Sequence, residues 1–468
     1  MTGDSMDNNF EELNELVKRF ESARKNDEYI YLEESDLEEI VDFYLDGQNF
    51  EKAIDAADKG IEQYQFSSTF YIKKAEVLIE MQQYDLANEL LDKVNGLSPN
   101  DIPTTLLRID ILIHHAQYKE AVALLEHIIE KAHTDERADL YLELADVYEE
   151  WEKYDEVFEI LEQCLEIDAN NEEALNRLWF CTELTEKYDA SIEIHQALID
   201  REPYNLLAWY NLAHAYSGMH LYEKSVEAFE YAIVIDDEYE LCYKDCGSVL
   251  YKMGQYNKAI ELYTEAIEKG SPQKEVYYNI GRCYDKLDKR DKAREFYKKS
   301  ISIDPYYAKA FHKIGENFLE TELPKSALSP LERAVKLDKK NDHFLHSLAK
   351  AYIHVNEYDK AEQIYVEMIQ MNNLNKQAHL DLAALLYEKG ALNEAVEEVD
   401  IIIDLFDDDK SLLYIKVIFL LEIGNRAEGL SILTEALACA PDGLPYLYKM
   451  LPEIQNDAEI MLLIEQMK

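Results

Sequence analysis

Seven side chains between residues 240 and 320 are of types that could together bind a carboxylate. Lysine and arginine carry positive charge that attracts carboxylates, and amide and hydroxyl groups can donate hydrogen bonds to the oxygens. Two or three such cations and an amide would bind the terminal carboxylate of a peptide, or an acidic side chain beside it. The predicted site consists of Lys244, Ser248, Asn279, Lys309 and Lys313, flanked by Arg282 and His312.

Histidines in the same part of the chain offer a metal site as an alternative. His312, His343, His346 and His354 could bind a transition metal if their ring nitrogens converged on one ion. They lack a compact ligand spacing, so we expect them to make polar contacts in a groove, and we predict no metal and no other cofactor. The sequence also lacks a phosphate-binding Gly-Lys-Ser/Thr loop, a dinucleotide fingerprint, a nucleophile elbow and a zinc-protease motif. We therefore predict that the chain is not an enzyme.

These residues lie within repeated units of 34 residues. Gly247, Gly281 and Gly315 are spaced by 34 residues, and an alanine recurs at the same interval. A constant interval of this size is typical of an array in which each unit packs on its neighbours. If each unit is numbered 1 to 34, twelve units cover residues 34–443, with one longer step of 36 residues. The predicted units start at Glu34, Ser68, Ile102, Ala138, Glu172, Leu206, Glu240, Lys274, Ala308, Asp342, Lys376 and Lys410.

Two helical faces recur in every unit. Positions 4, 7, 8 and 11 form one face and positions 17, 20, 24 and 27 form the other, with a break near position 14 or 15 at residues such as Gly47, Gly218 and Gly254. This pattern predicts two antiparallel helices joined by a tight turn. Position 20 is Ala, Ser or Gly in every unit except one, which has Val157, because a large side chain there would hold the helices apart. Positions 2, 5, 6, 9, 12 and 13 of the first helix point away from this core, and all seven predicted site residues occupy them.

The residues at these positions resemble the tetratricopeptide repeat (TPR) family. The resemblance is strongest in the five units from Leu206 to Asp342 and weaker at Glu172 and Ile102, where Trp179 and Ile109 replace the small residue of position 8. It implies an all-α, right-handed solenoid of helix pairs whose first helices line a concave groove. In the unit at Leu206, the residues that match the family pattern are Trp209, Leu212, Ala213, Tyr216, Phe229 and Ala232, and Ser225 stands where the pattern has Ala.

The cations of the predicted site also look like the carboxylate clamp of chaperone-binding TPR proteins. That clamp has Lys and Asn in one unit, Asn in the next, and Lys with Lys or Arg in the third. Lys244, Asn279, Lys309 and Lys313 match it in kind, whereas Ser248 stands where Asn is expected. An ordinary polar groove is the alternative to a clamp.

Segments outside the repeats are predicted to cover the ends of the array, because terminal units would otherwise expose an apolar face. Residues 1–33 are predicted to form a tail and a capping helix that starts at Asn9, with Glu12 completing a capping box. Residues 444–468 are predicted to form a short helix before Pro452 and a final helix around Ile460 and Ile464.

Charge narrows the class of partner. The chain has 96 acidic and 47 basic residues, a net charge of −49 that would repel nucleic acid. No stretch could span a bilayer, no signal peptide is evident, and six cysteines without paired spacing fit a reducing compartment, so we expect a cytoplasmic protein.

Residues 251–350 are an exception to the acidic character of the chain, because they contain 15 acidic and 20 basic residues. A local basic surface would attract acidic ligands; the alternative is a solvated face with pairs such as Asp288–Lys292.

The sequence therefore predicts a non-catalytic scaffold that binds extended segments of other proteins, with acidic or C-terminal peptides as candidates and residues 240–350 as the contact zone. Two alternatives stay open at this point. The chain could be a regulatory or substrate-recruiting subunit of a separate enzyme. It could also self-assemble weakly, with its acidic half against the basic segment of another copy.

Overall fold

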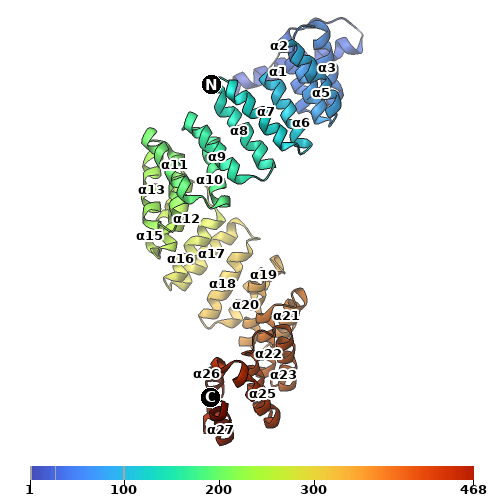
Figure 1. The fold of residues 1–468 in the computed structure, drawn as a ribbon. Helices are drawn as coiled ribbons and strands as arrows, with labels where there is room; N and C mark the ends of the chain where they lie inside the picture. The colour runs from blue at the N-terminus through green and yellow to red at the C-terminus, as the bar shows by residue number, and fades with distance from the viewer. Residues whose placement is uncertain (1–2, 27, 99–100, 468) are drawn as a thin grey trace. The chain divides into compact units, whose positions relative to one another are not determined.

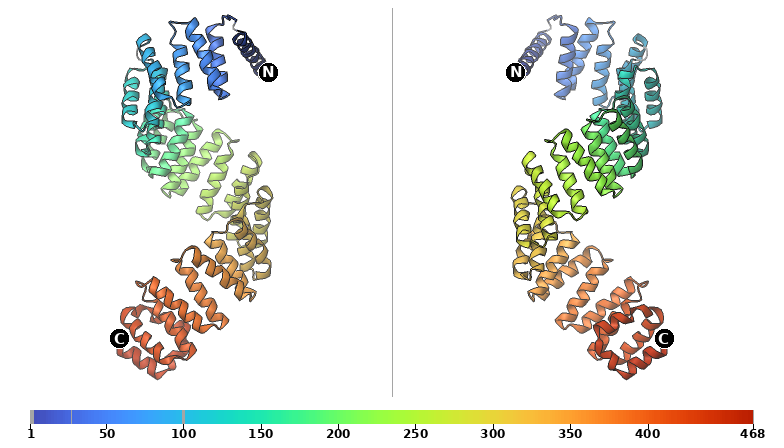
Figure 2. Two further views of the ribbon diagram at one scale, coloured as in Figure 1. Left: turned by 90° about the vertical axis from the view of Figure 1, so that its right-hand side faces the viewer. Right: turned by 90° about the vertical axis from the view of Figure 1, so that its left-hand side faces the viewer.

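The computed structural model describes residues 3–26, 28–98 and 101–467, and in these ranges it consists of helices and the turns between them (Figure 1). Side chains are described within these ranges from residue 13 onward, except at 97 and 135. The chain forms two compact units, Met1–Asp236 and Asp237–Lys468, here called the N-terminal unit and the C-terminal unit. Within each unit, consecutive helices pack side by side as antiparallel pairs (Figure 2).

The helices of the N-terminal unit are α1 (Gly3–Lys25), α2 (Glu34–Asp46), α3 (Phe50–Gln63), α4 (Thr69–Glu80), α5 (Tyr84–Leu97), α6 (Ile102–His114), α7 (Tyr118–Lys131), α8 (Thr134–Glu150), α9 (Tyr154–Ile167), α10 (Glu172–Thr185), α11 (Tyr188–Arg201), α12 (Leu206–Gly218) and α13 (Tyr222–Ile235). Those of the C-terminal unit are α14 (Glu240–Lys252), α15 (Tyr256–Lys269), α16 (Lys274–Lys286), α17 (Arg290–Ile303), α18 (Ala308–Glu320), α19 (Pro324–Leu337), α20 (Asp342–His354), α21 (Tyr358–Met371), α22 (Lys376–Lys389), α23 (Leu392–Leu405), α24 (Leu412–Ile423), α25 (Arg426–Cys439), α26 (Leu444–Met450) and α27 (Ala458–Met467), with short 3₁₀ helices at Pro441–Gly443 and Pro452–Asn456.

A helix begins at nine of the twelve predicted unit starts. The exceptions are α4 and α24, which begin one and two residues late, and α8, which begins at Thr134 rather than Ala138. This early start lies in the 36-residue step, where the Glu136 side chain accepts a hydrogen bond from the His133 backbone N–H at 3.3 Å and closes a capping box. We retain the twelve-unit division of residues 34–443 as the proposed register of the array.

Several first helices start where they do because a side chain at position 34 of the preceding unit caps them. The carboxylate of Asp101 accepts the N–H of Thr104 at 2.9 Å, and Asn205 accepts that of Ala208 at 2.8 Å. Each cap satisfies a backbone donor that the helix itself leaves without a partner. The same contact is made by Asn171, Asn341 and Asn375.

The turn inside every proposed unit is made at position 15, where the backbone has a positive φ. The residues are Gln48, Gln82, Ala116, Glu152, Glu186, His220, Gly254, Asp288, Glu322, Asn356, Gly390 and Gly424. The predicted break near position 14 or 15 is confirmed: Gly47 lies in the turn between α2 and α3, and Gly254 has a positive φ. Gly218 is the last residue of α12, directly before the turn. At Gly218 the space that a side chain would need is filled by the ring of Tyr188.

Replacing Glu186 with Gly is expected to stabilise the N-terminal unit by about 0.5–1 kcal/mol, because a side chain in the left-handed region costs energy that glycine avoids. Glu186 has φ 56° and ψ 22°. As a control, Asn176→Gly in the exposed interior of α10 should lower stability instead. Urea denaturation of both variants measures the difference, and a destabilising Glu186→Gly would contradict the strain argument.

The core of each 34-residue repeat depends on small residues where the two helices of the repeat meet. Position 20 is fully buried throughout the array, as at Ala259 and Ala293, which are 0% exposed. At position 8, Gly281 lies against the ring of Tyr297 at position 24, and an added Cβ would come within 2.5 Å of that ring. Gly247 faces Tyr263 in the same way. Gly315 faces Leu331 at the same two positions, so a glycine at position 8 leaves room for a bulky side chain at position 24.

The terminal segments cover the ends of the array. Helix α1 begins at Gly3, so the predicted start at Asn9 is wrong, and the side chains of the proposed capping box lie outside those described. Val17 and Phe20 of α1 are buried in the same core cluster as Leu37, Ile40 and Val41 of α2. At the other end, Leu447 of α26 and Ile460 and Ile464 of α27 join the last core cluster. Among the described helices, none combines the length and apolar character needed to cross a bilayer.

Candidate functional site

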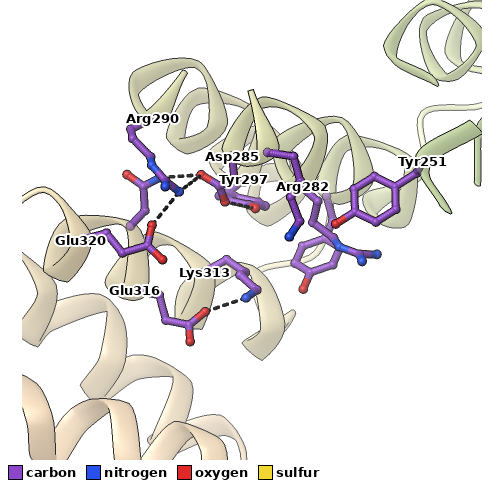
Figure 3. A pocket seen from close by; sticks show the side chains of 11 residues that line it. Tyr251, Arg282, Asp285, Arg290, Tyr297, Lys313, Glu316 and Glu320 are labelled. Atoms are coloured by element: carbon purple, nitrogen blue, oxygen red, sulfur yellow. Dashed lines mark hydrogen bonds and ion pairs between the residues drawn. The ribbon is translucent and has the colours of Figure 1, made fainter. Parts of the chain in front are cut away.

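A cleft of about 480 Å³ opens on the C-terminal unit between α14, α16, α17 and α18 (Figure 3). Its walls carry four cations, three carboxylates, an amide and three tyrosines. On α14, α16 and α18 the lining residues occupy the positions assigned from the sequence to the face opposite the core, apart from Asn317 at position 10. The lining residues are Tyr251, Tyr278, Arg282, Asp285, Lys286, Arg290, Tyr297, Lys313, Glu316, Asn317 and Glu320.

Asp285 is bonded to three other residues of the cleft lining. Its carboxylate accepts hydrogen bonds from the Tyr297 hydroxyl at 2.5 Å and the Asn317 amide at 2.6 Å, and it lies 3.4 Å from a guanidinium nitrogen of Arg290. Burial of the phenol and the nearby carboxylate raise the pKa of Tyr297 well above its ordinary value, so it remains a donor. Asp285 therefore joins α16 to α17 and α18 and has little capacity left for a ligand.

Two ion pairs neutralise other charges in the cleft. Arg290 is 2.6 Å from Glu320, and the Lys313 ammonium is 2.6 Å from Glu316 one turn along α18. Both pairs are partly open to solvent, so each contributes about 0–1 kcal/mol to stability. The carboxylate of a ligand could therefore replace Glu316 as the partner of Lys313 with little loss of free energy.

Arg282 and Lys286, one turn apart on α16, have no carboxylate partner among the described residues. The Arg282 guanidinium lies over the ring of Tyr251, 4.4 Å from the ring centre, and is 3.4 Å from the Asn279 side-chain oxygen. Stacking on the ring holds the planar group in place without neutralising its charge. These two side chains are the part of the cleft that is available to an anion.

The structure brings only two of the seven predicted site residues, Arg282 and Lys313, into the cleft. Lys244 on α14 is half-buried and Lys309 on α18 is exposed, and both lie outside the cleft lining. The Ser248 hydroxyl is within 3.0 Å of the Tyr263 hydroxyl and donates to the Lys244 carbonyl, so it is already engaged. Asn279 is occupied with Arg282.

His312 was expected on the open face, but it is 7% exposed. Its Nε2 atom is 2.9 Å from the Ser347 hydroxyl and its ring packs on Phe344, 4.7 Å between ring centres. Burial lowers the pKa of His312. Position 5 thus points into the contact between α18 and α20 at this repeat, which the single-helix pattern does not reveal.

The other histidines of the region also have separate roles. His346 lies 3.0 Å from an Asp381 oxygen, and no group of three or more metal-ligating side chains is found within the described residues. The Asp288–Lys292 pair does not form: Asp288 sits in the turn before α17 and bonds Arg290 at 3.1 Å, while Lys292 lies over the ring of Tyr284.

Sequence reasoning missed most of the cleft wall. Lys286 and Tyr251 occupy positions 13 and 12 of their units, which the helical-face argument had included, so they could have been identified from the same pattern. Asp285 also occupies position 12, but its bonds to Tyr297 and Asn317 on two other helices could not be predicted. Asn317 is at position 10, outside the assigned face.

Comparison with known proteins identifies the repeat. Three models described as tetratricopeptide repeat match, together over more than half of the chain: one at residues 138–171, 206–239, 246–268 and 274–307, one at 78–149 and one at 346–410. No curated protein sequence matches the chain.

Solved structures with a similar fold have low sequence identity. A chain of the APC/C hetero-tetramer Cut9–Hcn1 is 15% identical, with 81% of this chain and 88% of that chain covered and a TM-score of 0.38. The C-terminal part of a TPR repeat-containing protein from Cytophaga hutchinsonii is 16% identical, with 50% and 99% covered and a TM-score of 0.45. YrrB, described as a TPR protein with an unusual peptide-binding site, is 16% identical, with 39% and 95% covered and a TM-score of 0.33.

The 34-residue helix pairs, the small residues at their contacts and the matching repeat models agree. They show that the chain belongs to the tetratricopeptide repeat family, whose fold is a scaffold for protein–protein interaction.

Proposed function

We propose that the cleft of the C-terminal unit binds an acidic segment, or the free C-terminal carboxylate, of a partner protein. The observation that carries the proposal is the pair of cations Arg282 and Lys286, which face the cleft without a carboxylate partner in the described part of the chain. Arg282 would donate two parallel hydrogen bonds to a carboxylate, while stacking on Tyr251 holds its planar guanidinium in place.

Other side chains would extend the contact along the ligand. Lys313 would exchange Glu316 for the incoming carboxylate, and the exposed Lys309 would meet a second acidic residue. Lys244 and Ser248 of α14 and Asn279 of α16 lie outside the cleft lining and would border the proposed site, where Asn279 orients Arg282. His312 lies beneath this surface and would act only by fixing the position of α18 against α20.

The distribution of charge along the chain supports an acidic ligand for this cleft. Residues 251–350 carry 20 basic and 15 acidic side chains in a chain whose net charge is −49. An acidic ligand is repelled by most of the molecule and attracted to this segment, so its binding should be local and should weaken as salt screens the attraction.

A fluorescent ten-residue peptide that ends in three aspartates with a free carboxyl terminus serves as the probe. Replacing both Arg282 and Lys286 with Ala should weaken binding about ten-fold or more, because charge-assisted hydrogen bonds are lost. Lys309→Ala with Lys313→Ala should weaken binding several-fold. Fluorescence anisotropy at two salt concentrations measures both effects.

The matched control removes two exposed lysines of the same unit that lie outside the cleft, Lys258 and Lys298. This double variant should change the affinity less than two-fold. Equal losses in the cleft variant and the control, or equal affinity for a peptide with asparagines and an amidated terminus, would rule the proposal out.

A further inference from the structure

A second cleft, of about 420 Å³, lies on the N-terminal unit between α11, α12 and α13. Its charge differs from that of the first cleft: two carboxylates and one cation line it beside aromatic rings, whereas the first cleft has four cations and three carboxylates. The side chains that matter are Trp209 and Tyr216 of α12, Tyr231, Glu227 and Lys224 of α13, and Asp200 of α11.

The aromatic wall of this cleft is held rigidly. The Trp209 and Tyr231 rings stack with centres 4.5 Å apart and planes 26° from parallel. The Trp209 indole N–H donates to the Pro203 carbonyl at 3.0 Å, and the Tyr216 hydroxyl accepts from Gln196 at 2.8 Å. Trp209 covers one face of the Tyr231 ring. Tyr231 is 57% exposed, so the other face of its ring is open to a ligand.

The carboxylates of Asp200 and Glu227 are exposed and have no ion pair or hydrogen bond within the described residues. The only cation in the lining is Lys224, whose ammonium lies 5.4 Å from the centre of the Tyr216 ring. It approaches the ring rather than either carboxylate, which shows that the aromatic wall can accept a positive group. Two acceptors beside an open aromatic face therefore remain unused.

We propose that this cleft binds an arginine side chain from an extended basic segment of a partner protein. The planar guanidinium would stack on the open face of Tyr231 and donate hydrogen bonds to Asp200 and Glu227, a combination that suits arginine better than lysine. Charge complementarity favours this occupant, since residues 1–236 contain 55 acidic and 18 basic side chains. The site is separate from the acidic-ligand cleft of the C-terminal unit and takes a ligand of opposite charge.

Binding of a fluorescent, terminally blocked peptide with one central arginine pair among serines and glycines tests the proposal on the full chain. Tyr231→Ser should weaken binding about five-fold, and Asp200→Asn with Glu227→Gln about ten-fold or more. A peptide with citrulline in place of both arginines should bind no better than background, and a lysine peptide should bind more weakly than the arginine peptide.

A matched control separates this site from the general attraction of an acidic protein for basic peptides. Glu230→Gln removes one exposed carboxylate from the same helix outside the cleft, and Tyr306→Ser removes an exposed tyrosine of the C-terminal unit. Both should change the affinity less than two-fold. If Glu230→Gln matches the effect of either cleft carboxylate singly replaced, or if citrulline peptides bind as tightly, the arginine site is overturned.

Discussion

Replacing Gly281 with Val is expected to destabilise the C-terminal unit by about 1–3 kcal/mol, because overpacked cores force side chains and backbone to shift. The Cβ of any residue at 281 would come within 2.5 Å of the Tyr297 ring. Tyr297 is 0% exposed and bonded to Asp285, so its ring cannot turn aside without breaking that bond. Urea denaturation followed by far-ultraviolet circular dichroism measures the loss, and the acidic peptide should bind the variant more weakly, since Tyr297 also lines the cleft.

The matched control is the same substitution at Gly96 in α5, where no atom of the described residues, apart from the chain neighbours and the backbone of α5 itself, lies within 4 Å of the Cβ position. Gly96→Val should leave stability within about 0.5 kcal/mol of the parent or raise it slightly, because valine favours a helix more than glycine does. Similar losses at the two glycines would show that the recurring small residues are not required for close packing.

His195 is expected to make the N-terminal unit lose stability in mild acid. The side chain is 0% exposed at position 24 of its repeat, where the next repeat has the equally buried Phe229. Its Nδ1 atom is 2.7 Å from the Ser191 carbonyl, and its Nε2 atom has no hydrogen-bond partner among the described residues. A proton on Nε2 would therefore be buried without an acceptor, and burial lowers the pKa of His195 to about 4.

The sign of the effect follows from where the proton binds. Between pH 6.5 and 4 the unfolded chain binds a proton at this histidine and the folded chain does not, so stability falls as pH decreases through that range. The free energy of unfolding falls by about 3 kcal/mol in total, at 1.36 kcal/mol per pKa unit. Above pH 7 the histidine is neutral in both states and causes no loss.

His195→Phe should remove this dependence, and the difference between the two proteins from pH 7 to pH 4.5 is the quantity to measure. The difference is needed because burial raises the pKa of carboxyls such as Asp110 and Glu143, and these groups act in the opposite direction. Parallel stability curves for the two proteins would contradict the prediction.

Much of the fold follows from residue spacing. Small residues at position 20 and bulky residues at position 24 recur in step, so a single chain reveals helix pairs and their contacts. The 36-residue step misplaced the start of α8, because the capping residues His133 and Glu136 lie outside the repeat pattern. The two compact units were not predicted either, since the same 34-residue step continues across Asp236.

The candidate site was less accessible to sequence reasoning. Helical periodicity identified the face that Arg282 and Lys313 share, but not that His312 turns into the contact with α20 or that Ser248 is engaged by Tyr263. These outcomes depend on bonds between helices. That Arg282 and Lys286 lack a carboxylate partner among the described residues could be recognised only after the ion pairs of their neighbours were known.

Hydrogen–deuterium exchange with and without a saturating amount of the acidic, free-carboxylate peptide tests the central claim most directly, because it locates the ligand without altering the chain. We predict slower exchange in α16 and α18, at residues 274–286 and 308–320, and no change in the N-terminal unit. Slower exchange confined to other helices, or none at saturation, would contradict the proposed site.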